Sequence, residues 1–312
     1  KSIFSFFLIV FFTGIFSVFL ISLCLDSLPN SVFAKSEIVS SSGKLSFILN
    51  NLHNSPAKRQ GVFLTVGILF LISFSLFIKE TNKKQFAITS SIAIFLHLLF
   101  GNYGWYNRYE IYVWTFLILI IIYFLSPYAV HLIEKERANI KKIIFILICF
   151  LCITSIRYVI DLFTIPLASN NIYEQHYQMH RFAVDFYKKP IAVNDIGYVS
   201  YKNDNFVLDL AGLSSKEALN YWKNGGNIEL LSSLVKKRNI ELIMIYKDLL
   251  INIPNEWLEV GDLKLEKKRI TPAGSNVTFF ATNQIAYQEI KRKLELFKKT
   301  LPSSVNFTFK DN

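Results

Sequence analysis

The sequence predicts an α-helical transmembrane bundle of about five spans, followed by a small outer-facing α/β domain. Two observations predict this fold class. The 312-residue chain is 52% hydrophobic and only 18% charged, whereas soluble domains carry about 25% charged residues. The charge is also uneven, because residues 1–165 hold 14 Lys/Arg and 7 Asp/Glu while residues 166–312 hold 20 and 16. We therefore divide the chain into a transmembrane helical region, 1–165, and an extracytoplasmic α/β domain, 166–312.

The overall composition narrows the class of protein further. A mean hydropathy of +0.34 argues against a disordered chain and against an ordinary soluble globule. The 15% of aromatic residues, 29 of them Phe, is typical of a protein that faces lipid. The net charge of +11 then indicates basic loops at a membrane surface and not a nucleic-acid-binding protein.

Five apolar stretches predict the spans. They cover residues 3–25, 61–78, 86–103, 111–126 and 142–165. A span needs about 20 apolar residues, and about 17–25 are tolerated. The third and fourth stretches are short and flank a polar segment, so they form either two spans joined by a tight turn or a pair of tilted helices. We favour two spans.

The basic loops predict the orientation. The 79–85 and 127–142 loops are rich in Lys and Arg, which places them on the cytoplasmic side. The 26–60 loop, the 101–110 loop and everything after residue 165 then lie outside a cytoplasmic membrane that the chain crosses several times. The apolar run from Ile3 to Leu25 is too long for a signal peptide. We expect the chain to be the C-terminal part of a larger polytopic protein.

In the second half, helical and strand patterns alternate. Such alternation predicts a small α/β layer with a mainly parallel sheet. Helices are expected at 171–188, 214–222, 227–239 and 284–299, strands at 190–195, 205–212 and 240–246, and a hairpin at 258–282. The first turn of the second of these helices offers Ser214 as a cap, with Glu217 three residues on. The tail after residue 300 is expected to be loose.

Several common chemistries have no motif in this sequence. There is no G-x-x-x-x-G-K-[ST], G-x-G-x-x-G, H-E-x-x-H or G-x-S-x-G, so nucleotide hydrolysis, dinucleotide redox chemistry and common hydrolase chemistry are unsupported. Cys149 and Cys152 lie in an apolar run, where thiols stay protonated and inert. His176 and His180 share a helix face without a carboxylate companion, so no metal site is predicted. Whether a divalent metal is required stays open.

Two outer segments carry cations suited to a phosphate. Lys35 follows the first span at headgroup level, and Arg108 lies with Tyr109 and Glu110 in a very short outer loop. The Arg guanidinium is a planar fork that pairs well with phosphate. The alternative is anchoring, because Lys and Arg snorkel and aromatic rings gather at interfaces in most membrane proteins.

Polar residues of the second half form another candidate group. Tyr173, Gln175 and His176 follow the last span, and a plain surface helix is the alternative interpretation there. Asn194, Asp195 and Asp209 lie at strand ends, where α/β sheets present groups to ligands. Turn formation is the alternative for these three residues.

Five segments carry a family resemblance in their order and spacing. They are PNSVFAKS, HLLFGNYGWYNRYEIY, NIYEQHYQM, IAVNDIGYVSY and VLDLAGL. Over about residues 20–250 the chain resembles the C-terminal half of bacterial GT-C-type polytopic membrane glycosyltransferases. That family is arabinofuranosyl- and mannosyltransferase-like and uses polyprenyl-phosphate sugars.

The resemblance implies a reaction and a set of partners. A sugar would pass from a polyprenyl-phosphate donor to an extracytoplasmic glycan or lipid acceptor at the bilayer, with no nucleic acid involved. It implies that the catalytic base lies upstream of this chain. Lys35 and Arg108 would hold the lipid phosphate, and Tyr109 and Glu110 would orient them or meet the sugar. The remaining contacts, on the acceptor side, would come from Tyr173, Gln175, His176, Asn194 and Asp195. The donor sugar, the acceptor and the carrier are not specified.

Two other function classes stay open. One is a non-catalytic membrane accessory or glycan-binding protein of cell-envelope assembly. The other is a lipid-glycan transporter, which is less well supported because Arg157 and Asp161 are the only charged candidates inside a predicted span.

Overall fold

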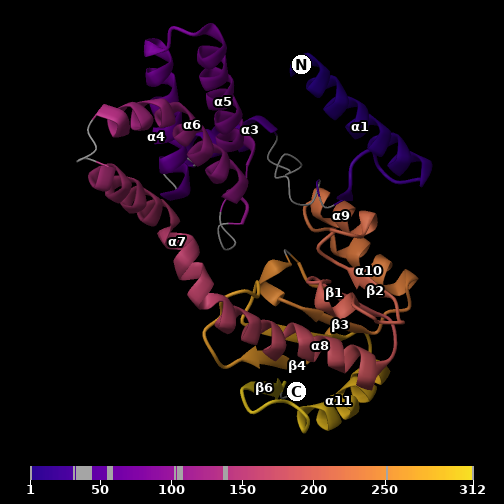
Figure 1. Cartoon of the computed structure of the whole chain (residues 1–312). Coiled ribbons are helices and arrows are strands. Elements are labelled where there is room, and N and C mark those ends of the chain that lie inside the picture. The colour runs from indigo at the N-terminus through magenta and orange to yellow at the C-terminus, as the bar shows by residue number, and fades with distance from the viewer. Residues whose placement is uncertain are drawn as a thin grey trace. The chain divides into compact units, whose positions relative to one another are not determined.

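A computed structural model gives the fold of the chain (Figure 1). It describes residues 2–30, 32, 44–54, 59–101, 103, 108–135, 140–250 and 252–310. Two compact units are present: unit 1 comprises Lys1–Ser41 and Pro166–Asn312, and unit 2 comprises Ser42–Ile165. We call the part of unit 1 after residue 165 the sheet unit, and unit 2 the helical unit.

Helices make up most of the described part of the helical unit. They are α3 (Lys44–Asn54), α4 (Arg59–Phe77), α5 (Thr81–Phe100), α6 (Ile111–Lys135) and the first part of α7 (Ile140–Glu174). Leu64, Leu71, Ile94 and Leu117 are buried together between α4, α5 and α6. Gly67 allows α4 to approach α6 closely, because a Cβ there would overlap the Leu117 side chain.

The prediction of a five-span bundle was wrong. Among the described residues, one helix is long and apolar enough to cross a membrane, Ile111–His131. Phe7–Ser22, within α1 (Ser2–Ser22), and Gly61–Phe77 are shorter apolar helices. The apolar stretches do mark helices, but polar residues shorten their apolar length. In α5, for example, the first five residues are Thr81–Gln85.

Unit 1 contains a six-stranded sheet of order β2-β1-β3-β5-β4-β6. The strands are β1 (Ile191–Val193), β2 (Val207–Asp209), β3 (Leu242–Ile245), β4 (Leu258–Leu265), β5 (Asn276–Ala281) and β6 (Val305–Phe309). β1 pairs in parallel with β2 and β3, whereas the pairs β3–β5, β5–β4 and β4–β6 are antiparallel.

The sheet corrects two predictions from the sequence. It is mixed and not mainly parallel, because the 258–282 hairpin and the chain end add an antiparallel half. The tail is not loose, because Val305–Phe309 forms β6 against β4. Val305 and Phe307 point into the core and Asn306 and Thr308 to solvent, which is the alternation of a strand buried on one face.

Both faces of the parallel half are covered by helices. One face packs on α8 (His176–Arg181) and the π-helix η3 (Phe182–Tyr187), and α11 (Gln284–Lys298) continues this layer over β4 and β5. The other packs on α9 (Lys216–Lys223) and α10 (Ile228–Lys237). Successive residues of β3 alternate between these two cores, as strand geometry requires: Leu242 and Met244 in the first, Ile243 and Ile245 in the second. Polar residues line the second face of the antiparallel half, namely Asp262, Lys264, Asn276 and Thr278.

The helix predicted at 171–188 is divided in the structure. α7 continues to Glu174, Gln175 leaves helical geometry at φ −121° and ψ −69°, and α8 begins at His176. Lys188, in the left-handed region at φ 59°, ends η3 two residues before Pro190. At this break the side chains of Gln175 and His176 turn toward the sheet, where both contact Tyr246. The cap of α9 is Ser215 and not Ser214, since Ser215 Oγ accepts from Ala218 N at 3.1 Å.

Candidate functional site

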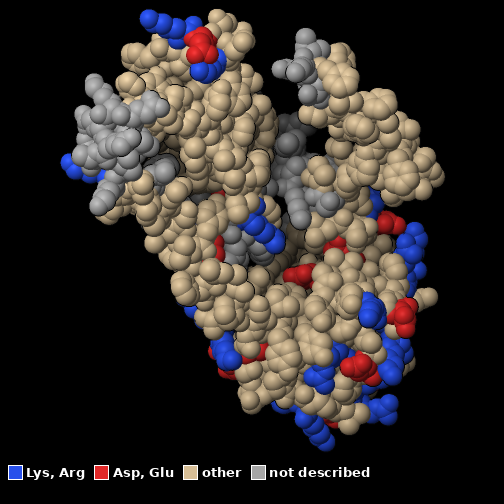
Figure 2. Space-filling model, viewed as in Figure 1, with Lys and Arg blue, Asp and Glu red and all other residues tan. Residues whose placement is uncertain are grey.

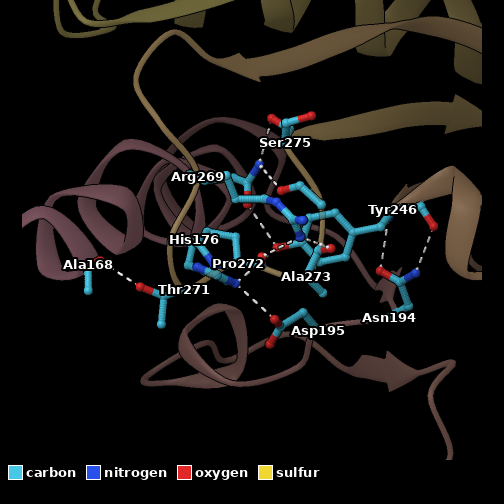
Figure 3. A network of polar contacts seen from close by, with 12 residues as sticks. Ala168, His176, Asn194, Asp195, Tyr246, Arg269, Thr271, Pro272, Ala273 and Ser275 are labelled. Carbon is cyan, nitrogen blue, oxygen red and sulfur yellow. Dashed lines mark hydrogen bonds and ion pairs between the residues drawn. The ribbon is translucent and has the colours of Figure 1, made fainter. Parts of the chain in front are cut away.

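The candidate site lies at the carboxyl ends of the parallel strands. The chain runs from β1 to β2 on one side and returns to β3 on the other. In open α/β sheets, ligand groups gather where the strand order reverses in this way. Asn194 and Asp195 follow β1 and Tyr246 follows β3, so all three lie at that point (Figure 3).

His176 connects the α7–α8 junction to this edge. Its Nε2 lies 2.8 Å from Asp195 Oδ2 and 3.1 Å from Tyr246 Oη (Figure 3). An ionised carboxylate only accepts hydrogen bonds, so the bond assigns the hydrogen to Nε2. His176 is buried, and its Nδ1 has no hydrogen-bond partner in the described part of the chain. The ring therefore orients Asp195 and does not itself face solvent.

We call the hydrogen-bonded group of Gln175, His176, Asn194, Asp195 and Tyr246 the network. Asp195 is its open member. Its side chain is 36% exposed, and no hydrogen bond to Oδ1 is formed by the residues that the structure describes. Gly197 borders this oxygen, since a Cβ at Gly197 would lie 3.4 Å from Oδ1. Oδ2 is engaged by His176, so Oδ1 is held in place as an acceptor for an incoming donor group.

Tyr246 is the buried member of the network. Its hydroxyl donates to Gln175 Oε1 at 2.8 Å. Burial raises the pKa of Tyr246, the Asp195 carboxylate raises it further, and Arg269 lowers it by a smaller amount. The hydroxyl therefore stays protonated at physiological pH and acts as a hydrogen-bond donor, not as a base.

The β4–β5 loop, residues 266–275, covers Tyr246 and holds the end of α7. Gln175 Nε2 donates to the carbonyls of Gly274 at 3.3 Å and Ser275 at 3.2 Å. One turn earlier, Asn171 Oδ1 accepts from Ile270 N at 2.7 Å. Gly274 is needed at the crossing, because a Cβ there would lie 2.6 Å from the Tyr246 ring. The loop thus links the helix that leads into the sheet unit to the network.

Charged side chains add to this link. Lys267 Nζ lies 3.2 Å from Glu174 Oε1, and Glu174 is fully buried. Neither carboxylate oxygen of Glu174 has a hydrogen bond of good geometry in the described residues, so the ion pair is its stabilising contact. Arg269 donates to the carbonyls of Pro272 (3.1 Å) and Ala273, which fixes the tip of the loop (Figure 3).

The other strand-end residues have structural partners. Asn194 Oδ1 accepts from Tyr246 N at 3.0 Å, and Asn194 Nδ2 donates to Tyr246 O at 3.1 Å. Asp209 accepts from Ala211 N and Ser214 N at 2.9 and 2.7 Å, which forms the turn after β2. Both side chains therefore shape the edge of the sheet.

A group of aromatic rings flanks the network on the α8 side. We call it the aromatic surface and define it as Tyr173, Tyr177, His180, Tyr198 and Tyr201. Tyr177 stacks on Tyr173 at 5.5 Å and meets Tyr198 edge to face at 5.7 Å. Tyr173, Tyr198 and Tyr201 are exposed. Tyr177 follows His176 directly and Tyr198 comes three residues after Asp195, so the surface adjoins the carboxylate.

A small polar pocket of about 170 Å³ lies on the other side of Tyr246. Asp262 and Glu259 line it with Lys247. These groups are already paired, because Lys247 lies 2.7 Å from Glu259 and Thr278 donates to Asp262 at 2.6 Å. Among the described residues, no group of three or more His, Cys, Asp or Glu could hold a metal ion.

The candidate phosphate residues belong to other parts of the chain. Lys35 lies outside the described residues. Arg108 is exposed, and its guanidinium lies 5.3 Å from the Tyr109 ring centroid. Glu110 is fully buried. Of the predicted acceptor residues, Gln175, His176, Asn194 and Asp195 meet in the network, and Tyr173 belongs to the aromatic surface.

We predict that Tyr246→Phe lowers the free energy of unfolding by about 1–2 kcal/mol. The change leaves the buried Gln175 Oε1 without its hydrogen-bond donor and removes one of the two polar contacts of His176 Nε2. Denaturant titration of the full chain, followed by tryptophan fluorescence, measures the change. Tyr201→Phe removes an exposed hydroxyl and should stay within about 0.5 kcal/mol of the unmodified protein. Equal effects of the two substitutions would contradict the prediction that the Tyr246 hydroxyl stabilises the fold.

Comparison with known families adds one match. Residues 170–280 match the model of a family described as a domain of unknown function (DUF8728). The matched segment runs from the end of α7 into β5 and contains the whole network. No curated protein and no solved structure matches the chain.

Proposed function

We propose that the chain is the C-terminal part of a membrane glycosyltransferase. In this proposal the enzyme transfers a sugar from a polyprenyl-phosphate donor to an extracytoplasmic glycan or lipid acceptor, and the sheet unit binds the acceptor. The observation that carries the proposal is the open Oδ1 of Asp195 beside the aromatic surface. The order of the sequence motifs that resemble GT-C enzymes supports it independently.

The chemistry of this surface suits a carbohydrate. A sugar ring presents an apolar C–H face and a rim of hydroxyl groups. Aromatic faces pack against the first, and a carboxylate oxygen accepts hydrogen bonds from the second. Binding sites commonly combine aromatic walls with a few fixed polar groups that set orientation. Asp195, fixed by His176 at 2.8 Å, is such a group.

The proposal assigns the donor to a different part of the chain. Arg108 is an exposed guanidinium suited to the donor phosphate. It precedes α6, which contains the membrane-crossing candidate Ile111–His131. We place the protein in the cytoplasmic membrane.

The acceptor role is tested with a Tyr177→Ala/Tyr198→Ala double variant. We expect the KM for the acceptor to rise about tenfold or more, since each aromatic stacking partner contributes about 0.5–1.5 kcal/mol. The KM for the donor should stay unchanged. Transfer is measured in membranes with labelled polyprenyl-phosphate sugars and a titrated acceptor.

Phe206→Ala is the matched control. Its ring is exposed in the same unit but lies at the start of β2, away from the carboxyl edge. An unchanged acceptor KM in the double variant would contradict the acceptor role. If the unmodified protein binds glycans but transfers no sugar from any donor, the accessory glycan-binding function replaces the enzyme.

A further inference from the structure

The helical unit contains a hollow of about 520 Å³ that the proposed function does not use. The end of α4, the start of α5 and the second half of α6 enclose it. Pro127 lies inside α6 at this point, where it removes one helical hydrogen bond and disturbs the preceding turn. The hollow therefore lies at the level of Pro127 along α6.

Aromatic rings form the walls of the hollow. Phe74 contacts Phe124 at 5.6 Å and Tyr128 at 6.0 Å, and Tyr123 lies beside Phe124 at 5.2 Å. Phe77 also lines the hollow and is 82% exposed. These rings give the hollow an apolar lining that is open to the outside of the helical unit.

Cations lie on the rim of the same hollow. Lys83 pairs with Glu80 at 2.7 Å, whereas Lys79 makes no ion pair or hydrogen bond in the described part of the chain. Two lysines against one glutamate leave a net charge of +1 on the lining. In Figure 2 most of the visible surface of the helical unit carries no charge, and basic and acidic groups gather at one end of it (top of the view).

We propose that this hollow binds the phosphate-bearing headgroup of an anionic phospholipid. The lysines would meet the phosphate, and the aromatic walls would meet the glycerol and the first acyl carbons. A volume of about 520 Å³ falls in the usual range for ligand sites, about 300–1,000 Å³. Basic pockets between helices at a membrane surface bind anionic headgroups in this way.

The position of the hollow along α6 supports a lipid ligand and separates it from Arg108. It lies toward the end of the helix that is long and apolar enough to cross a membrane, where Tyr rings are typical of the lipid–water interface. Ile111 and Tyr123 are both in α6, and at 1.5 Å per residue they lie about 18 Å apart along its axis. The lipid site is thus distinct from the proposed donor site.

The test measures lipid-dependent stabilisation of the full chain in neutral detergent micelles. We expect Tm to rise as phosphatidylglycerol is added and to stay constant with phosphatidylcholine. In a Lys79→Ala/Lys83→Ala variant the midpoint of that titration should move about tenfold higher. Lys84→Ala is the matched control, because Lys84 is exposed on the same turn but does not line the hollow.

A second variant, expected to shift the titration midpoint in the opposite direction, keeps the proposal testable if the double variant is unstable. Glu80→Gln removes the competing carboxylate and should lower the midpoint for phosphatidylglycerol. Equal responses to the two lipids, or a Glu80→Gln midpoint that does not fall, would overturn the proposal. If inorganic phosphate stabilises the chain as well as phosphatidylglycerol does, the site recognises free phosphate and the lipid assignment fails.

Discussion

Phe279→Ala is expected to lower the free energy of unfolding of the sheet unit by about 3–5 kcal/mol, the usual cost of removing a fully buried aromatic ring. Phe279 is fully buried in β5, which pairs with both β3 and β4. Its ring lies 5.6 Å from Phe182 and 5.2 Å from Phe307. The cavity would therefore open between η3 and the C-terminal strand β6, and neither side can collapse into it without moving the sheet.

The change is measured as the shift of the denaturant midpoint of the full chain, with the slope of the transition compared as a check on two-state behaviour. Ile285→Ala, in the first turn of α11, is the control, because its side chain is 83% exposed. That variant should stay within about 0.5 kcal/mol of the unmodified protein. A loss below about 1 kcal/mol for Phe279→Ala would mean that the ring does not pack as the structure describes.

The sequence predicted which segments of the second half are helices and strands better than it predicted how the strands pair. The local patterns that indicate β3 and the hairpin are short-range, whereas the pairing of β3 with β5 joins residues such as Met244 and Phe279. Nothing in the local pattern determines which hairpin strand lies next to β3. The mixed sheet results from contacts between distant segments.

The C-terminal strand β6 has a clear pattern in the sequence. Val305, Phe307 and Phe309 alternate with Asn306 and Thr308, which is the pattern of a half-buried strand. The expectation of a loose tail rests on position at the chain end, where short segments are often unpaired. The structure shows Phe307 fully buried against Phe279, so the alternation was the better guide.

Part of the candidate site could be predicted from the sequence, and the reason is physical. The carboxyl ends of parallel strands meet at one edge, so Asn194 and Asp195 could be selected from their position after a strand. Tyr246 follows the next parallel strand by the same rule, but an aromatic residue after an apolar strand is equally typical of a core position. The contacts of Gln175 with the 266–275 loop could not be predicted, since they depend on the break in α7 and on a loop about 100 residues away.

Arg108→Ala is expected to reduce sugar transfer from polyprenyl-phosphate donors by about 100-fold or more. This magnitude is typical when a charged group that binds the reacting phosphate is removed. Arg108 is exposed and its guanidinium lies against the Tyr109 ring, which limits its motion while leaving its N–H groups available. Arg108→Lys keeps the charge without the planar fork, so we expect it to retain part of the activity.

Transfer is measured in membranes that contain equal amounts of each variant, with labelled polyprenyl-phosphate sugars as donors. Lys84→Ala, which also removes one exposed cation from the helical unit, is the control and should transfer normally. Because Arg108 belongs to the helical unit and its side chain is exposed, the unfolding midpoint and the acceptor KM should stay unchanged. Normal turnover by Arg108→Ala would contradict the proposal that Arg108 binds the donor phosphate. Loss of turnover together with a raised acceptor KM would mean that Arg108 affects the binding of both substrates.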